Sequence, residues 1–241
     1  MRLPTIFLFD IDGTLITITR AGRAAMERAF TRHFREHRLG EGAEVFADFS
    51  FAGMTDRAIV RAGIERMVGA EGEAQDIDER LVDRLMNDYA ANLAEALSRA
   101  NDYRLHQGAS EAIELAEGRP ESALGLGTGN LRLAAKAKLD PFDLYERFRF
   151  GGFGCEHEDR ATILRLGADR GARLIGRDRE ECEIIVIGDT PKDVSAGHAI
   201  GARVIAVATG PFNKDALREA GALHVFDDLR DAEARAIIAG G

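Results

Sequence analysis

The stretch TIFLFDIDGTLIT, residues Thr5 to Thr17, decides how the rest of the chain is interpreted. Its first half is apolar and indicates a buried strand. Asp10 and Asp12 follow at the end of that strand, with a single residue between them. A buried carboxylate is costly unless a cation or a hydrogen bond meets it. Because a strand needs neither acid, the pair indicates a functional site.

Composition narrows the possible functions. The chain has 241 residues, of which 45% are hydrophobic and 30% charged, as in an ordinary globular protein. Its net charge of -9 argues against a nucleic-acid partner, and an anionic substrate would need a local positive site such as a metal ion. The sequence has no apolar run near the length of a membrane span and no signal-peptide pattern. Cys155 and Cys182 lie far apart, so we expect reduced thiols and a cytoplasmic location.

The segment after the first strand has helical periodicity only. Three helices are expected between residues 20 and 97, and Thr55 or Asp56 is expected to cap the second. Their apolar faces carry Met26, Ala29, Phe30, His33 and Phe34, then Ile59, Val60, Ile64 and Met67, then Leu81, Leu85, Tyr89, Leu93 and Leu97.

From about residue 106, strands and helices alternate. Strands are expected at SALGLGTGN, which runs into a turn, and at FRFGGFG, EIIVIGDT, RVIAVATG and HVFDDL, with helical segments before and between them. Such alternation predicts an α/β fold, a Rossmann-like, mostly parallel sheet flanked by helices. The first strand would join this sheet, and the helical block would be an inserted all-helical cap domain. The predicted boundaries are 1–18 and 98–241 for the core and 19–97 for the cap.

Three polar clusters follow strands of this sheet. Asp10 and Asp12 follow the first strand, Thr128-Gly129-Asn130 follow the second, and Asp189 follows EIIVIG, with Asp193 nearby. Ligands of such sheets bind at the carboxyl ends of the strands, so the clusters should converge. Carboxylates gathered together repel one another, and Mg²⁺, which takes oxygen ligands, would relieve this. One acid could attack as a nucleophile while the other handles protons.

Each cluster alone has a simpler interpretation, as a turn or a helix cap, and GTGN lacks the G-x-G-x-x-G pattern of a dinucleotide site. Together and in this order, FDIDGTL, GTGN and GDTPKD resemble the haloacid dehalogenase superfamily of phosphatases. The resemblance implies that Asp10 is the nucleophile that forms an aspartyl-phosphate and that Asp12 is the general acid and base. It also implies that Asp189 ligates Mg²⁺ together with Asp10 and the main-chain carbonyl of Asp12, and that Asp193 is either a further ligand or holds a ligand in place.

The resemblance further implies that Thr128 and the backbone after it, Gly129 and Asn130, bind the phosphoryl oxygens. The superfamily usually has a lysine between the second and last motifs, often followed by proline, and no such pair occurs in that interval. Arg160, at a helix start, is the candidate replacement, since arginine can hold a phosphate through two hydrogen bonds. Lys192 and Lys136 are the alternatives, and a solvent-exposed Arg160 is the simpler interpretation.

The best match by resemblance is to phosphoglycolate-phosphatase-like members, which act on a small phosphorylated metabolite. Asp12 argues against dehalogenation, and the absence of lysine between residues 20 and 97 argues against imine-forming phosphonate hydrolysis. A sugar-phosphate mutase stays open, as does, less favoured, a phospho-aspartate signalling module. Arg20 and Arg57 are candidates for pairing with an anionic part of the substrate.

Overall fold

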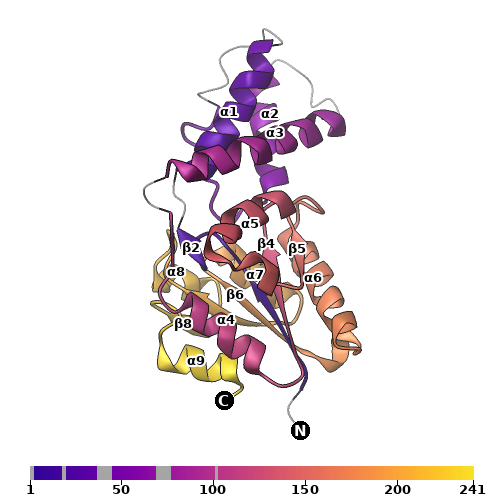
Figure 1. The fold of residues 1–241 in the computed structure, drawn as a ribbon, viewed down its shortest axis with the longest axis vertical. Coiled ribbons are helices and arrows are strands. Elements are labelled where there is room, and N and C mark those ends of the chain that lie inside the picture. The colour runs from indigo at the N-terminus through magenta and orange to yellow at the C-terminus, as the bar shows by residue number, and fades with distance from the viewer. Residues whose placement is uncertain (1–2, 18–19, 37–44, 69–76, 101–102) are drawn as a thin grey trace.

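The computed structural model describes residues 3–17, 20–36, 45–68, 77–100 and 103–241. Within these residues six parallel strands form one sheet, in the order β5-β4-β1-β6-β7-β8 (Figure 1). They are β1 (Thr5–Phe9), β4 (Ser122–Thr128), β5 (Phe150–Phe153), β6 (Glu183–Gly188), β7 (Arg203–Val207) and β8 (His224–Phe226). A short antiparallel pair, β2 (Ile16–Thr17) and β3 (Arg104–Leu105), lies outside this sheet. The predicted parallel α/β sheet is confirmed.

Strand β1 shows how both faces of the sheet are covered. Successive side chains of a strand point to opposite faces. Phe7 and Phe9 pack in one apolar cluster with α4 (Ala109–Gly118), α5 (Arg132–Leu139) and α9 (Ala232–Ala239). Ile6 and Leu8 pack in another with α6 (Arg160–Leu174), α7 (Pro191–Ala199) and α8 (Lys214–Glu219). Strand β1 is therefore apolar throughout because neither of its faces meets water.

The strand order reverses at β1. After β1 the chain adds β4 and then β5 on one side, and afterwards β6, β7 and β8 on the other. In open α/β sheets, a ligand crevice forms outside the carboxyl ends of the strands at such a reversal. The loops after β1, β4 and β6 border this crevice. The 3₁₀ turns η2 (Asp140–Phe142), η3 (Tyr145–Arg147) and η4 (Arg179–Glu181) lie elsewhere along the chain.

Helices α1 (Ala21–Glu36), α2 (Asp56–Val68) and α3 (Glu79–Ser98) form a separate layer beyond this edge of the sheet (Figure 1). We call them the helical insertion. They share an apolar cluster that includes Phe30, Phe46 and Leu85, and that extends to α5 through Ala134. The three predicted helices are confirmed, and Thr55 caps α2 by accepting from the amide of Ala58 at 3.1 Å. The predicted boundary at 18/19 lies outside the described residues.

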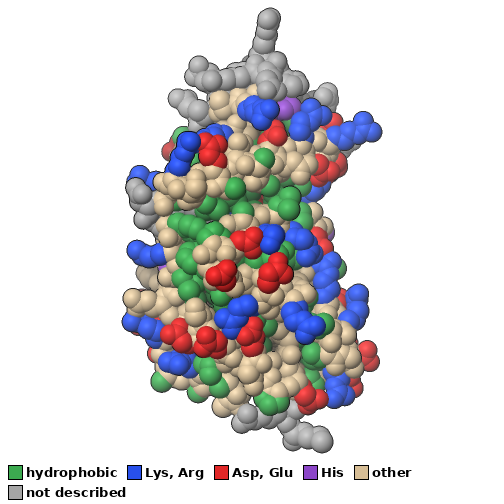
Figure 2. Space-filling view, in the orientation of Figure 1, with side chains coloured by type: hydrophobic (Ala, Val, Ile, Leu, Met, Phe, Trp, Pro, Cys, Tyr) green, Lys and Arg blue, Asp and Glu red, His purple; other side chains and the backbone are tan. Residues whose placement is uncertain are grey.

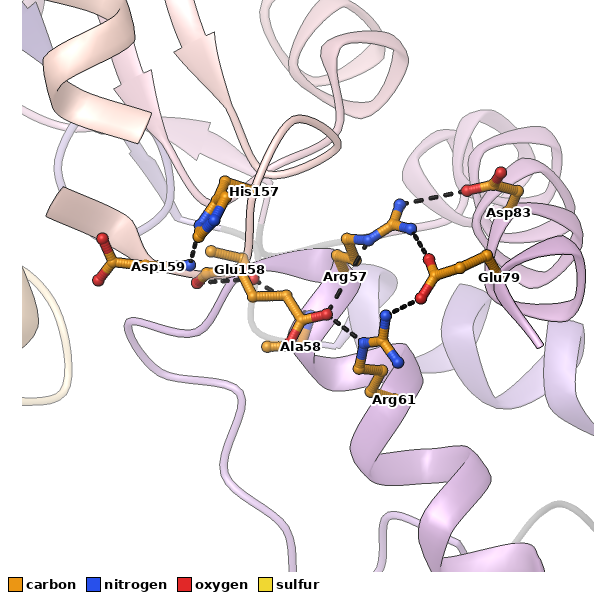
Figure 3. Close-up of polar contacts among 9 residues, drawn as sticks. Arg57, Ala58, Arg61, Glu79, Asp83, His157, Glu158 and Asp159 are labelled. Atoms are coloured by element: carbon orange, nitrogen blue, oxygen red, sulfur yellow. Dashed lines mark hydrogen bonds and ion pairs between the residues drawn. The ribbon is translucent and has the colours of Figure 1, made fainter. Parts of the chain in front are cut away.

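An ion-pair cluster connects the helical insertion to the core (Figure 3). Arg61 of α2 pairs with Glu158, which lies two residues before α6, and also with Glu79 of α3. Arg57 pairs with Glu79 and, at 3.2 Å, with Asp83. The Glu158 carboxylate is thus the core's contribution to a group of charges otherwise supplied by the insertion.

The outer surface carries mixed charge. On the face in Figure 2, hydrophobic side chains gather where the helical insertion meets the core, and acidic and basic side chains alternate below them. Cys155 and Cys182 are free thiols, which confirms that they form no disulfide. Among the described residues, no helix is both long enough and apolar enough to cross a bilayer.

Candidate active site

A cavity of about 480 Å³ lies between the helical insertion and the carboxyl edge of the sheet. The core lines it with residues from all three loops that the sequence singled out, among them Asp10, Asp12, Gly129, Asn130 and Asp189, and with Arg160 from the start of α6. Thr128 and Asp193 are buried directly beside these residues. The predicted convergence of the three clusters is therefore present in the structure.

Three carboxylates meet in the centre of the site. One oxygen from each of Asp10, Asp189 and Asp193 lies within 4.8 Å of the others, and all three side chains are buried. The pKa of Asp10 is raised to about 6. Burial is the largest cause, Arg160 opposes it, and the neighbouring Asp193 carboxylate adds to it. Burial also raises the pKa of Asp189 well above its ordinary value, and Asp193 and Asp10 add to this. The cluster therefore favours a cation among its oxygens.

Local hydrogen bonds orient two of these acids. Asp193 and Thr190 form a capping box at the start of α7, in which Asp193 Oδ2 accepts from the Thr190 amide at 3.0 Å and from its hydroxyl at 2.7 Å. This leaves Asp193 Oδ1 facing the site. Asp189 Oδ1 accepts from the Thr14 hydroxyl at 3.1 Å. A helix cap and a strand-end turn thus fix which carboxylate oxygens face inward.

Gly13 is required in the turn that follows Asp12. Its φ of +80° is in the left-handed region that glycine adopts without strain. A Cβ at this position would also collide with the carboxylate of Asp189. The turn can therefore bring the first loop against the third only because residue 13 has no side chain.

Arg160 lies between two of the acids. It is the first residue of α6, is only 7% exposed, and places Nη2 2.8 Å from Asp10 Oδ2 and 2.5 Å from Asp193 Oδ1. The simpler interpretation, an arginine in solvent, is wrong. Of the alternatives, Lys136 is exposed and pairs with Asp140 and Glu146, and Lys192 is exposed.

Asp12 belongs to a second polar group, which the sequence did not reveal in full. Lys138 Nζ lies 2.6 Å from Asp12 Oδ2 and 2.5 Å from Asn130 Oδ1. The side-chain amide of Asn130 donates from Nδ2 to Asp12 Oδ2 at 2.9 Å and to the Thr128 hydroxyl at 2.8 Å. Lys138 is buried and lines the cavity, and it was not among the residues predicted from the sequence.

The insertion lines the cavity with a different arginine from those expected. Arg57 belongs to the ion-pair cluster, and Arg20 is exposed, and neither is among the described residues that line this cavity. Arg23 lines it instead, with its guanidinium donating to the carbonyls of Phe46 and Phe49 at 2.5 Å each and lying 4.5 Å from the ring centre of Phe51. Arg23 was therefore missed by sequence reasoning, because its place depends on how α1 packs.

With this geometry, the comparisons with known proteins give the class of protein. The chain forms a parallel α/β sheet with an acidic site at the strand ends. The family model of haloacid dehalogenase-like hydrolases matches residues 4–201, so the chain belongs to this hydrolase family. A search of curated protein sequences finds no match.

Solved structures share the fold over nearly the whole chain. A predicted phosphatase from Clostridium acetobutylicum is 16% identical with a TM-score of 0.64, over 98% of this chain and 99% of that one. A predicted phosphoglycolate phosphatase from Haemophilus somnus is 18% identical with a TM-score of 0.62, over 95% and 96%. CbbY from Rhodobacter sphaeroides, in complex with phosphate, is 16% identical with a TM-score of 0.62, over the same shares. At these identities the similarity shows the fold.

Proposed function

We propose that this hydrolase is a Mg²⁺-dependent phosphatase that cleaves a small, phosphoglycolate-like phosphomonoester through an aspartyl-phosphate on Asp10. The observation that carries the proposal is the meeting of Asp10, Asp189 and Asp193 with a buried arginine at the carboxyl ends of parallel strands. The phosphatase names of structures with the same fold add support.

The donor set fits magnesium. All three acids offer oxygen atoms, which are the ligands that this hard cation takes in proteins. Three ionised carboxylates and one guanidinium leave two negative charges, which a divalent cation would balance. We infer that Asp10, Asp189 and Asp193 hold Mg²⁺ together with the main-chain carbonyl of Asp12. When bound, the ion would neutralise charge on the phosphoryl oxygens.

The chain's own residues would perform two displacements. In the first, a carboxylate oxygen of Asp10 bonds to phosphorus while the ester P–O bond breaks, and Asp12 gives a proton to the leaving oxygen. In the second, a water oxygen bonds to phosphorus while the bond to Asp10 breaks, and Asp12 takes a proton from that water. Free alcohol and inorganic phosphate are the products.

Arg160 would supply the positive charge that the family usually draws from a lysine. It contacts Asp10 Oδ2 at 2.8 Å, so a phosphoryl group on Asp10 would form within its reach. The Thr128 hydroxyl, which lowers the pKa of Asp10, and the backbone of Gly129 and Asn130 would hold the remaining phosphoryl oxygens. Preorganised donors of this kind stabilise charge that develops in the transition state.

The helical insertion would act as the cap domain and choose the substrate. The proposed division is core 1–18 and 98–241, and cap 19–97. On the cap side, the cavity is lined by Met26, Phe51 and Tyr89 beside Arg23, which could pair with a substrate carboxylate. This composition suits a small ester with one further anionic group. We also propose that the chain works in the cytoplasm, consistent with its free thiols.

Phosphate release from a panel of small esters tests the function. We expect phosphoglycolate and related esters to be hydrolysed with Mg²⁺ and not with EDTA. If sugar phosphates are isomerised and no net phosphate is released, the chain is a mutase. A stable phospho-aspartate with no turnover of any ester would indicate a signalling module. If release is unchanged by EDTA, the metal proposal is wrong.

A further inference from the structure

Lys138 is a buried cation that the steps above do not use. It lies on α5, is 4% exposed, and contacts Asp12 and Asn130 rather than Asp10. A buried ammonium is costly unless it is well paired, so its position needs an explanation. Exposed Lys136 on the same helix shows that α5 could have carried its positive charge in solvent instead.

The two carboxylate oxygens of Asp12 have different surroundings. Oδ2 accepts from Lys138 at 2.6 Å and from the Asn130 amide at 2.9 Å. Oδ1 is buried and accepts no hydrogen bond from the described residues, in a side chain that lines the cavity. Buried polar atoms in folded proteins nearly always have a partner. The Asp12 side chain as a whole is 41% exposed, so the part of it that faces the cavity is not Oδ1.

We propose that Lys138 and Asn130 are positioning residues that hold the Asp12 carboxylate through Oδ2, in the place where it exchanges protons with the substrate. This inference rests on the proposed phosphatase function. It separates the two buried cations of the site by task, since Arg160 contacts the nucleophile and Lys138 contacts the acid–base group. Lys138 acts through Asp12 and does not touch the reacting phosphorus.

The proton transfers then occur at a carboxylate that is held in place. As Asp10 bonds to phosphorus, a proton moves from the Asp12 carboxyl group to the oxygen of the breaking ester bond. As water bonds to phosphorus in the second step, its proton goes to the Asp12 carboxylate and the bond between phosphorus and Asp10 breaks. The contacts from Lys138 and Asn130 keep this carboxylate from rotating away from the leaving group.

Esters with different leaving groups test this proposal. An alkyl alcohol needs a proton in order to leave, whereas p-nitrophenolate leaves without one. For Lys138→Met, we expect kcat/KM to fall about 100-fold with an alkyl phosphate and less than about threefold with p-nitrophenyl phosphate, since general acid catalysis is worth about 100- to 10,000-fold. A burst of p-nitrophenolate should also precede slow turnover in this variant, because the water step needs the same carboxylate as a base.

Lys136→Met is the matched control, because it removes a lysine from the same helix at an exposed position. We expect it to leave both rates unchanged. If Lys138→Met does not fold, Asn130→Ala provides the same test, with the same selectivity for the alkyl ester.

Equal losses on both esters, with weaker inhibition by inorganic phosphate, would overturn the proposal and place Lys138 on the phosphoryl group. Unchanged kinetics in the Lys138 and Asn130 variants would overturn it as well. The absence of turnover by the wild-type chain on every ester would instead reject the phosphatase function, and this inference with it.

Discussion

Asp56 shows how one buried carboxylate connects the helical insertion to the core. It is the first residue of α2 and is 6% exposed, and its carboxylate accepts from the Leu131 amide at 2.7 Å. Its own amide donates to the Gly129 carbonyl at 2.7 Å. Burial raises the pKa of Asp56 to about 6, against the lowering effect of Lys138. The folded chain therefore holds this proton more tightly than the unfolded chain does.

Replacing Asp56 by Asn should remove a pH dependence of the free energy of unfolding. Because the folded-state pKa is raised, the contribution of Asp56 to stability is complete below its unfolded pKa of about 4 and is lost as pH rises through about 6. Asn keeps an oxygen that can accept from Leu131. Urea unfolding of both proteins from about pH 4 to about pH 7 measures this. The free energy of unfolding of wild type should fall relative to that of Asp56→Asn as the pH rises. If the difference between the two proteins stays constant, or if wild type gains on the variant, the prediction is wrong.

At the scale of single residues, the sequence identified the acids but not every cation. Asp10, Asp12 and Asp189 end strands or follow them directly, so topology alone predicts where they meet. Arg160 was predicted because it lies between the second and last motifs, where the resemblance implies a basic residue. Arg23 could not be predicted, since its partners are carbonyls of a distant loop whose course no periodicity reveals.

Helix α5 shows what an element adds to residue-level reasoning. Its buried positions are Ala134, Ala135, Lys138 and Leu139, which follow, with the buried N-cap residue Leu131, the spacing of one helical face. Lys138 falls on that apolar face, whereas Lys136 falls on the opposite side and is exposed. The helical pattern could therefore have selected Lys138 over Lys136, which the sequence analysis named as an alternative.

Gly129, in the turn after β4, allows two elements to approach closely. A Cβ here would collide with the backbone carbonyl of Met54, just before α2. We expect Gly129→Ala to destabilise the chain by about 1–3 kcal/mol, as overpacking does, and to lower kcat/KM at least about tenfold. Gly118→Ala is the control, because an added Cβ there meets no atom within 4 Å. Thermal unfolding and ester hydrolysis are measured for both variants. If Gly129→Ala has the same unfolding temperature and the same kcat/KM as Gly118→Ala, the prediction is wrong.

At the scale of the whole molecule, the helical insertion lines one side of the candidate site's cavity, and the carboxyl edge of the sheet lines the other. The parallel sheet and the existence of an inserted helical block were predictable, because strand and helix periodicities are local signals. How the block sits on the core was not predictable. That arrangement depends on contacts such as Arg61 with Glu158, which are 97 residues apart in the chain.

Glu158→Gln should loosen the insertion from the core. The substitution removes the charge that the core contributes to the ion-pair cluster of Arg57 and Arg61 (Figure 3). Pairs this exposed are worth about 0.2–1 kcal/mol, so we expect KM to rise about two- to fivefold while the unfolding temperature changes little. Asp83→Asn, which removes a pair within the insertion, should leave KM unchanged. Equal KM values in both variants and wild type would contradict the prediction.

The proposed mechanism requires Asp10 to carry the phosphoryl group during turnover. This can be measured by mixing the chain with Mg²⁺ and a radiolabelled phosphate ester, quenching with acid, and mapping the label to a peptide. We predict a hydroxylamine-labile label on the peptide that contains Asp10, and neither label nor phosphate release in Asp10→Asn. Phosphate release by wild type with no label on Asp10, or undiminished release by Asp10→Asn, would contradict the account.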